Sequence, residues 1–213
     1  IDPADGSILY KKGEVVDIVT TTCEEEALSD LLPLGHYIAY EYEAPEGMII
    51  DTNQYEINLE FKDNETEIIL ETLSITNERQ KVEVELTKLD LDRNTPIKGV
   101  VFNLKTTKDI LSYDGKVLVE AGEIIETSKT DSKGKLLFNA DLPLSFDDET
   151  YFEIVEDELY GYYKNEEVIS VDTKYKGQNV QKISNSQTIY NEAVKNYILI
   201  IHFIIIYKSL LNI

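Results

Sequence analysis

The chain has 213 residues, of which 42% are hydrophobic, and this is enough for two domains of about 100 residues with ordinary cores. Its 41 acidic residues outnumber the 20 basic ones and give a formal net charge of −21, which argues against binding to nucleic acid or to an anionic membrane surface. The single cysteine, Cys23, rules out an intrachain disulfide or a zinc cluster, and neither histidine lies in a catalytic motif, so we expect no metal and no cofactor.

The N-terminal residues include no methionine and no signal sequence, so we expect the chain to be a fragment of a longer protein. Residues 5–17 read as two short strands joined at a glycine turn, and the same pattern returns over 114–126. The Leu-Pro-Leu sequence of 32–34 also recurs, at 142–144, and both repeats have a spacing of roughly 110 residues. This conserved order along the chain predicts two tandem domains.

Short segments in which apolar and polar residues alternate fill both domains. No long stretch has the periodicity of a helix, and Asp, Asn and Gly residues mark the turns. We therefore expect an all-β fold of two antiparallel β-sandwiches, a first over 1–80 and a complete second over 81–195. Alternating apolar residues that share one face of a strand are Tyr55, Ile57, Leu59 and Phe61 in the first domain and Val100, Phe102 and Leu104 in the second.

The residues that follow the second domain, 196–213, form an apolar tail. Between Tyr197 and Tyr207 only His202 interrupts the apolar run, which is shorter than the roughly 20 residues that a membrane-spanning helix needs. Three interpretations remain open: a truncated membrane anchor, the first strand of a third domain, or the product of a damaged reading frame. We assign the tail no function.

One strand of the second domain breaks its own pattern. Side chains alternate between the two faces of a strand, so Val82, Val84, Leu86 and Lys88 share one face, and Lys88 is expected to point into the core. A buried ammonium group without a partner costs several kcal/mol. Lys88 must therefore be paired, neutral or consumed in a reaction.

The same argument places a carboxyl group and a carboxamide in that core. Glu156 shares a face with two apolar residues of its segment, and Asn191 shares one with Ile189. In the first domain Glu41 and Asn77 hold matching positions, although the face opposite Glu41 is equally apolar. Each of these residues, taken singly, has two simpler explanations. It could lie at a strand edge where its polar end reaches water, or it could form an ordinary buried salt bridge.

Together, Lys88, Glu156 and Asn191 predict a reaction. Burial favours a neutral lysine, which is a nucleophile, and a protonated glutamic acid. The acid can polarise the carbonyl of the asparagine and relay protons while the amine attacks, and the products are a Lys–Asn amide and ammonia. Such a reaction occurs once in each molecule, so we expect a self-crosslinking protein and not an enzyme that turns over.

The residues around these positions resemble those of a known family. Residues 84–90 followed by 95–102 look like the first strand and the Pro-Leu-x-Gly-Ala-x-Phe turn of the B-type repeats of Gram-positive surface adhesins and pilins, the Cna-B-like or SpaA-like domains. Residues 32–37 and 41–47 are similar to the Leu-Pro-x-Gly-x-Tyr and Glu-Thr-x-Ala-Pro-x-Gly motifs of that family. The resemblance implies a prealbumin-like, reverse immunoglobulin-like sandwich for each domain.

The resemblance also implies roles for the core residues of the second domain. Lys88 and Asn191 match the two partners of the family's intramolecular isopeptide bond, and Glu156 matches its catalytic glutamate. This domain departs from the family pattern in two places, since 156–162 lacks the Ala-Pro pair and Ser145 replaces a glycine. We expect these departures to change the loop near Glu156 and not its inward direction.

In the first domain, Glu41 and Asn77 match the catalytic glutamate and the acceptor asparagine. The lysine strand of that domain would precede Ile1, so the resemblance implies an N-terminally truncated domain that cannot form its own bond. For the whole chain, the resemblance implies an extracellular stalk or pilin-like adhesin on the cell wall, which resists extension. Its partners would be neighbouring repeats of the same protein, and only a C-terminal anchor would contact a membrane.

An alternative function is a binding module, in which the end loops of a sandwich recognise a host surface protein or a glycan. An exposed apolar or aromatic patch would favour that function. A turnover enzyme would instead need a concave pocket lined by carboxylates with perturbed pKa values.

Overall fold

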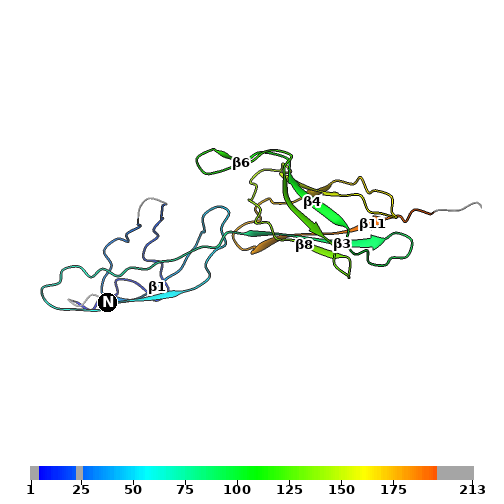
Figure 1. The fold of residues 1–213 in the computed structure, drawn as a ribbon. Coiled ribbons are helices and arrows are strands. Elements are labelled where there is room, and N and C mark those ends of the chain that lie inside the picture. The colour runs from blue at the N-terminus through cyan, green and yellow to red at the C-terminus, as the bar shows by residue number, and fades with distance from the viewer. Residues whose placement is uncertain (1–4, 23–25, 196–213) are drawn as a thin grey trace, which may run out of the picture. The chain divides into compact units, whose positions relative to one another are not determined.

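A computed structural model describes residues 5–22 and 26–195 of the chain (Figure 1). All the regular secondary structure of these described residues is β-strand, which confirms the expected all-β fold. The apolar tail 196–213 lies outside the described residues, as does Cys23.

The chain divides into two compact units. The first combines Ile1–Glu41 with Asp51–Ile75, and the second combines Tyr42–Ile50 with Thr76–Ile213. Relative to a boundary drawn between residues 80 and 81, the second unit therefore also includes 42–50 and 76–80. The division into repeats over 1–80 and 81–195 stays a prediction.

The first unit contains one hairpin of regular structure. Strand β1 (Gly35–Ala39) pairs antiparallel with β2 (Tyr55–Leu59), with Tyr37 opposite Ile57. Residues 5–17, which we expected to form two strands, form turns and irregular chain instead. None of the described residues of this unit is buried. Strands are marginal without a third strand or a packed face to support them, which explains why the expected pair does not form.

The second unit is a β-sandwich of two sheets. One sheet has the order β10-β9-β4-β7 and the other has the order β11-β3-β8. The four strands of the first sheet are β4 (Val101–Thr106), β7 (Ile124–Lys129), β9 (Phe152–Glu156) and β10 (Ile169–Val171). The three strands of the second sheet are β3 (Lys81–Asp90), β8 (Lys135–Phe138) and β11 (Lys182–Asn191).

Alternation along these strands builds a single core between the sheets. In β9 the side chains of Phe152, Ile154 and Glu156 are buried while those between them are half-buried. Val100, Phe102 and Leu104, which are two residues apart and so point to the same face as the sequence predicted, are all fully buried. They pack in one cluster with apolar residues of β3, β8, β10 and β11.

The first and last strands of this sandwich lie side by side and run parallel. Strand β3 pairs with β11 over their whole length, with Lys88 opposite Ile189 and Asp90 opposite Asn191. The other strand pairs of the sandwich are antiparallel, as expected. Parallel neighbours need a long crossover connection, and here the remaining strands of the domain provide it.

Two segments that precede β3 in the sequence belong to this second unit. Gln80 is fully buried, and its carboxamide donates to the carbonyls of Gly177 and Val180 and accepts from the N–H of Lys176 (3.0 Å). Its own N–H donates to the carbonyl of Gly47 (3.0 Å). Residues 42–50 and 76–80 therefore form part of the folded body of the sandwich.

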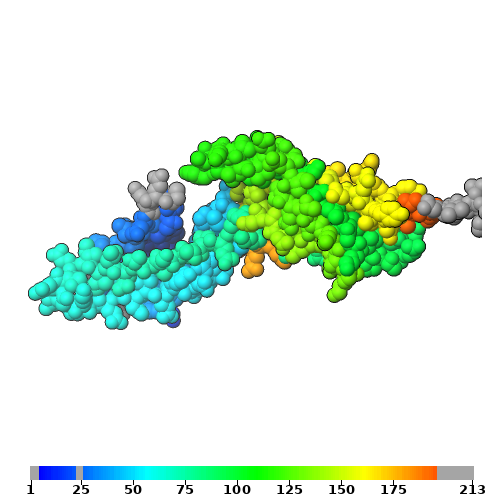
Figure 2. Space-filling view, in the orientation of Figure 1, coloured from blue at the N-terminus to red at the C-terminus, as the bar shows by residue number. Residues whose placement is uncertain are grey.

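A hairpin of β5 (Ile110–Leu111) and β6 (Val117–Val119) interrupts the path from β4 to β7. It projects from the body of the sandwich (Figures 1 and 2). Ile110 packs against the core, whereas Leu111 is 55% exposed, Leu118 is 62% exposed and Tyr113 is fully exposed. The hairpin thus presents three large apolar or aromatic side chains to solvent.

Candidate crosslinking site

Lys88 lies near the end of β3 and is fully buried. Its side chain points into the core, as the alternation of side chains along the strand predicted. Its N–H donates to the carbonyl of Gly134 (2.7 Å), and its carbonyl accepts from the N–H of Ile97 (3.0 Å). Gly134 has a φ of 71°, and a Cβ atom there would collide with the carbonyl oxygen of Lys88. Two hydrogen bonds, one to Gly134 and one from Ile97, therefore hold the backbone of Lys88 in place. The close approach of residue 134 to this backbone is possible only for glycine.

The two residues expected to meet Lys88 come from different sheets. Glu156 is the last residue of β9 and is 5% exposed, and Asn191 is the last residue of β11 and is 2% exposed. Asn191 is brought to Lys88 by the parallel ladder of β3 and β11. Glu156 belongs to the opposite sheet, where β9 pairs with β4 and Glu156 lies opposite Phe102.

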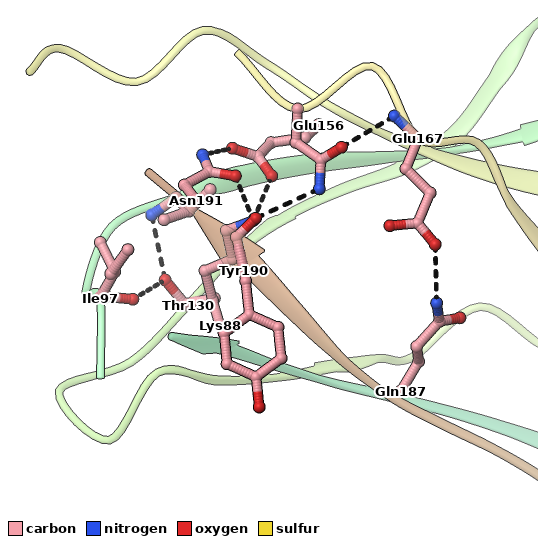
Figure 3. Close-up of polar contacts among 10 residues, drawn as sticks. Lys88, Ile97, Thr130, Glu156, Glu167, Gln187, Tyr190 and Asn191 are labelled. Carbon is pink, nitrogen blue, oxygen red and sulfur yellow. Dashed lines mark hydrogen bonds and ion pairs between the residues drawn. The ribbon is translucent and has the colours of Figure 1, made fainter. Parts of the chain in front are cut away.

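The three side chains form a closed triangle of hydrogen bonds (Figure 3). The Nζ atom of Lys88 lies 2.6 Å from Oε2 of Glu156 and 2.6 Å from Oδ1 of Asn191. The Nδ2 atom of Asn191 donates to Oε1 of Glu156. Each of the three residues thus contacts both of the others, and we call them the triad.

The surroundings of the triad are dry. The ring of Phe102 lies 5.7 Å from Nζ of Lys88, and both are fully buried. Desolvation lowers the pKa of the Lys88 amine below its usual value, and the hydrogen bond and charge of Glu156 oppose that shift. The site therefore shifts the amine toward its neutral, nucleophilic form while keeping a proton acceptor in contact with it.

The triad is buried in the interior of the sandwich, since Lys88 is 0%, Glu156 is 5% and Asn191 is 2% exposed. Two clefts lie on the second unit, one between β10 and β11 and one along 145–150 and 170–176, and the triad lines neither of them. The amine and the carboxamide thus lie within bonding reach of each other in the interior.

The residues expected to act in the first domain are less buried. Glu41 and Asn77 are both half-buried. Glu41 accepts a hydrogen bond from the N–H of Asp51 (2.5 Å), and Asn77 donates one to the carbonyl of Ile49 (3.0 Å). Glu41 belongs to the first compact unit and Asn77 to the second. Their proposed roles stay predictions.

Reasoning from the sequence missed two polar residues next to the triad. Asp90 is 1% exposed and occurs two positions after Lys88 on the same face of β3. Tyr162 donates a hydrogen bond from its hydroxyl to Oδ2 of Asp90 (3.1 Å). The parity rule that identified Lys88 would have identified Asp90 as well, whereas no local pattern marks Tyr162.

Comparisons with known proteins connect this geometry to a class. A scan against protein-family models and a search of curated proteins each find no match. Among solved structures, the chain is similar to the Bacillus anthracis TIE protein, with 26% identity over 83% of this chain and 28% of that one and a TM-score of 0.53.

Two major pilins are also similar in fold. BcpA of Bacillus cereus is 24% identical over 55% of this chain and 31% of its own, with a TM-score of 0.36. SpaA of Corynebacterium diphtheriae is 19% identical over 53% of this chain and 30% of its own, with a TM-score of 0.38. The chain therefore spans about a third or less of the length of these proteins.

The chain shares its fold with the Bacillus anthracis TIE protein, in agreement with a Cna-B-like, SpaA-like fold. This confirms the resemblance that the sequence motifs indicated. Within the described residues, no helix is long and apolar enough to cross a membrane.

Proposed function

We propose that this chain is a segment of an extracellular, wall-anchored stalk or pilin-like adhesin, and that an isopeptide bond between Lys88 and Asn191 stabilises its second domain. The observation that carries the proposal is the buried triangle of Lys88, Glu156 and Asn191. The cell-surface location follows from the resemblance of the sequence motifs to B-type repeats of surface adhesins and pilins, and the similarity to the Bacillus anthracis TIE protein supports the fold. Neighbouring repeats of the same protein would then be its partners.

In the proposed reaction, a proton first moves from Nζ of Lys88 to Oε2 of Glu156 along their 2.6 Å contact. The neutral amine attacks Cγ of Asn191, while the glutamic acid protonates Oδ1. The resulting carboxylate takes a proton from Nζ, and Glu156 passes it on to Nδ2. The bond from Cγ to Nδ2 breaks and ammonia leaves, while Oδ1 re-forms the carbonyl and returns its proton to Glu156, which ends the reaction protonated.

The bond would stabilise the domain by restricting its unfolded chain. Lys88 and Asn191 are 103 positions apart in the sequence. Closing a loop of about 100 residues is worth roughly 4–5 kcal/mol on the chain-entropy model used for disulfides. An amide cannot be reduced, so a protein with a single cysteine would gain covalent stability in any redox environment.

The direct test is the intact mass of the folded chain. We expect the wild-type protein to be lighter than its sequence by one ammonia, because the reaction expels Nδ2 of Asn191. The variants Lys88→Ala, Glu156→Ala and Asn191→Ala should each have the full mass of their sequence. Peptide mapping should find a branched peptide that joins Lys88 to Asn191, and a wild-type protein of unshifted mass would rule out the bond.

A second candidate function is binding of a host protein or glycan, and the β5–β6 hairpin favours it. Exposed apolar projections on a soluble protein often mark interaction sites. We expect the variant Tyr113→Ser/Leu118→Ser to lose binding to a panel of host matrix proteins and glycans, with unchanged thermal unfolding. A wild-type protein that binds no member of the panel would leave the stalk function as the better account.

A further inference from the structure

Asp90 is a buried carboxylate that the proposed reaction does not use. Its Oδ1 atom accepts hydrogen bonds from the N–H groups of Asp92 (3.0 Å) and Arg93 (2.8 Å), which closes the turn after β3. Its Oδ2 atom accepts from the hydroxyl of Tyr162 (3.1 Å) and lies 3.4 Å from the guanidinium of Arg93. The turn needs only Oδ1, so the burial of the second oxygen calls for a further explanation, since burying a carboxylate is costly.

Tyr162 occurs in the segment that follows Glu156, and that segment is paired with the chain that follows Asn191. Tyr162 forms an antiparallel bridge with Ala193, and the N–H of Val194 donates to the carbonyl of Gly161 (2.8 Å). The ring of Tyr162 is half-buried and packs against the core. One tyrosine, on the segment that follows β9, thus contacts the last residue of β3 and the chain that follows β11.

The position of this contact matters because the triad spans two sheets. The ladder of β3 and β11 already holds Lys88 beside Asn191. Glu156 belongs to the other sheet, and the bond between Asp90 and Tyr162 ties the segment that follows Glu156 to the last residue of β3. Next to Glu156 the chain is held by the hydrogen bond from the N–H of Asp157 to the carbonyl of Val101 (2.9 Å), and the Asp90–Tyr162 bond is the side-chain contact that ties this segment to the strand of the amine.

We propose that Asp90 and Tyr162 are positioning residues, a latch that holds Glu156 against Lys88 and Asn191 while the crosslink forms. The inference rests on the proposed function, because a latch has a measurable effect only if the bond forms. Misplacing a catalytic group by about 1 Å can slow a reaction by roughly a hundredfold. We therefore expect removal of the latch to slow crosslinking by at least about tenfold.

The test follows the loss of ammonia with time by intact mass, after a short pulse of cell-free synthesis of the full chain. Tyr162→Phe removes only the hydroxyl, and Asp90→Ala removes the whole carboxylate. Both variants should crosslink at least about tenfold more slowly than the wild type. The double variant should be no slower than Asp90→Ala, because two residues that act through one bond are not additive.

Two controls separate positioning from general loss of stability. Asp90→Asn keeps a polar group for the turn and for Tyr162, so it should restore most of the wild-type rate. Thr173→Val removes a buried hydroxyl that contacts Ser145 (3.2 Å), away from the triad, and should leave the rate unchanged.

Three results would overturn the latch: a Tyr162→Phe variant that crosslinks at the wild-type rate, a Thr173→Val variant as slow as Tyr162→Phe, or rate losses that multiply in the double variant. A wild-type chain that never loses ammonia would instead refute the proposed function itself, and the latch with it. The two failures are therefore distinguishable.

Discussion

Pulled from its two ends, the second domain should not lengthen between Lys88 and Asn191. Tension enters at the start of β3 and leaves at the end of β11, the first and last strands of the sandwich. With the isopeptide bond in place, tension passes from Lys88 directly to Asn191. Without it, the 103 positions between these residues would extend by about 350 Å, at roughly 3.4 Å per residue.

Single-molecule force spectroscopy with handles at both chain ends measures this difference. The wild-type chain should show no lengthening step of that size, and Lys88→Met should show one in each pull. Thr173→Val, which retains the triad, should behave like the wild type. A step of about 350 Å in the wild-type chain would contradict a covalent link between the two strands.

Glu156→Ala should be less stable than Lys88→Met, although both variants lack the crosslink. Each loses the roughly 4–5 kcal/mol expected from loop closure. Glu156→Ala also leaves a buried amine without its carboxylate, and breaking a buried ion pair from one side costs roughly 3–5 kcal/mol more. In Lys88→Met no amine is left buried without a carboxylate, and Glu156 keeps the hydrogen bond that it accepts from Asn191, so less of this second cost is incurred.

Urea unfolding over a range of pH distinguishes the two variants. The folded pKa of Lys88 is lowered by burial, so the unfolded chain binds more protons between that lowered value and the ordinary lysine pKa of about 10.4. The stability of Glu156→Ala should therefore rise with pH through this window, and that of Lys88→Met should not. If the two variants had equal free energies of unfolding with the same pH dependence, the amine of Lys88 would not be desolvated in the folded protein.

Much of the sandwich could be predicted from the sequence because side-chain alternation is a local property. Parity along a single strand was enough to place Phe102, Ile154 and Lys88 in the core, and all three are buried. The same rule identified Glu156 and Asn191 as inward polar residues. Their convergence on Lys88 needed the resemblance or the structure, because parity gives a direction and not a distance.

Features that depend on contacts between distant segments were not predicted. The parallel pairing of β3 with β11 depends on how the intervening strands return, and no residue of either strand encodes it. Tyr162 meets Asp90 across 72 positions of sequence. Residues 5–17 have the right alternation for strands, but the first unit gives them no buried face to pack against.

The burial of Gln80 has a consequence for where the second sandwich can be cut out of the chain. A segment cut at Lys81 would leave behind the carboxamide that links Gly177, Val180 and Lys176, together with the carbonyl of Gly47 that anchors it. A transplanted sandwich should keep its fold only if it brings residues 42–50 and 76–80 with it.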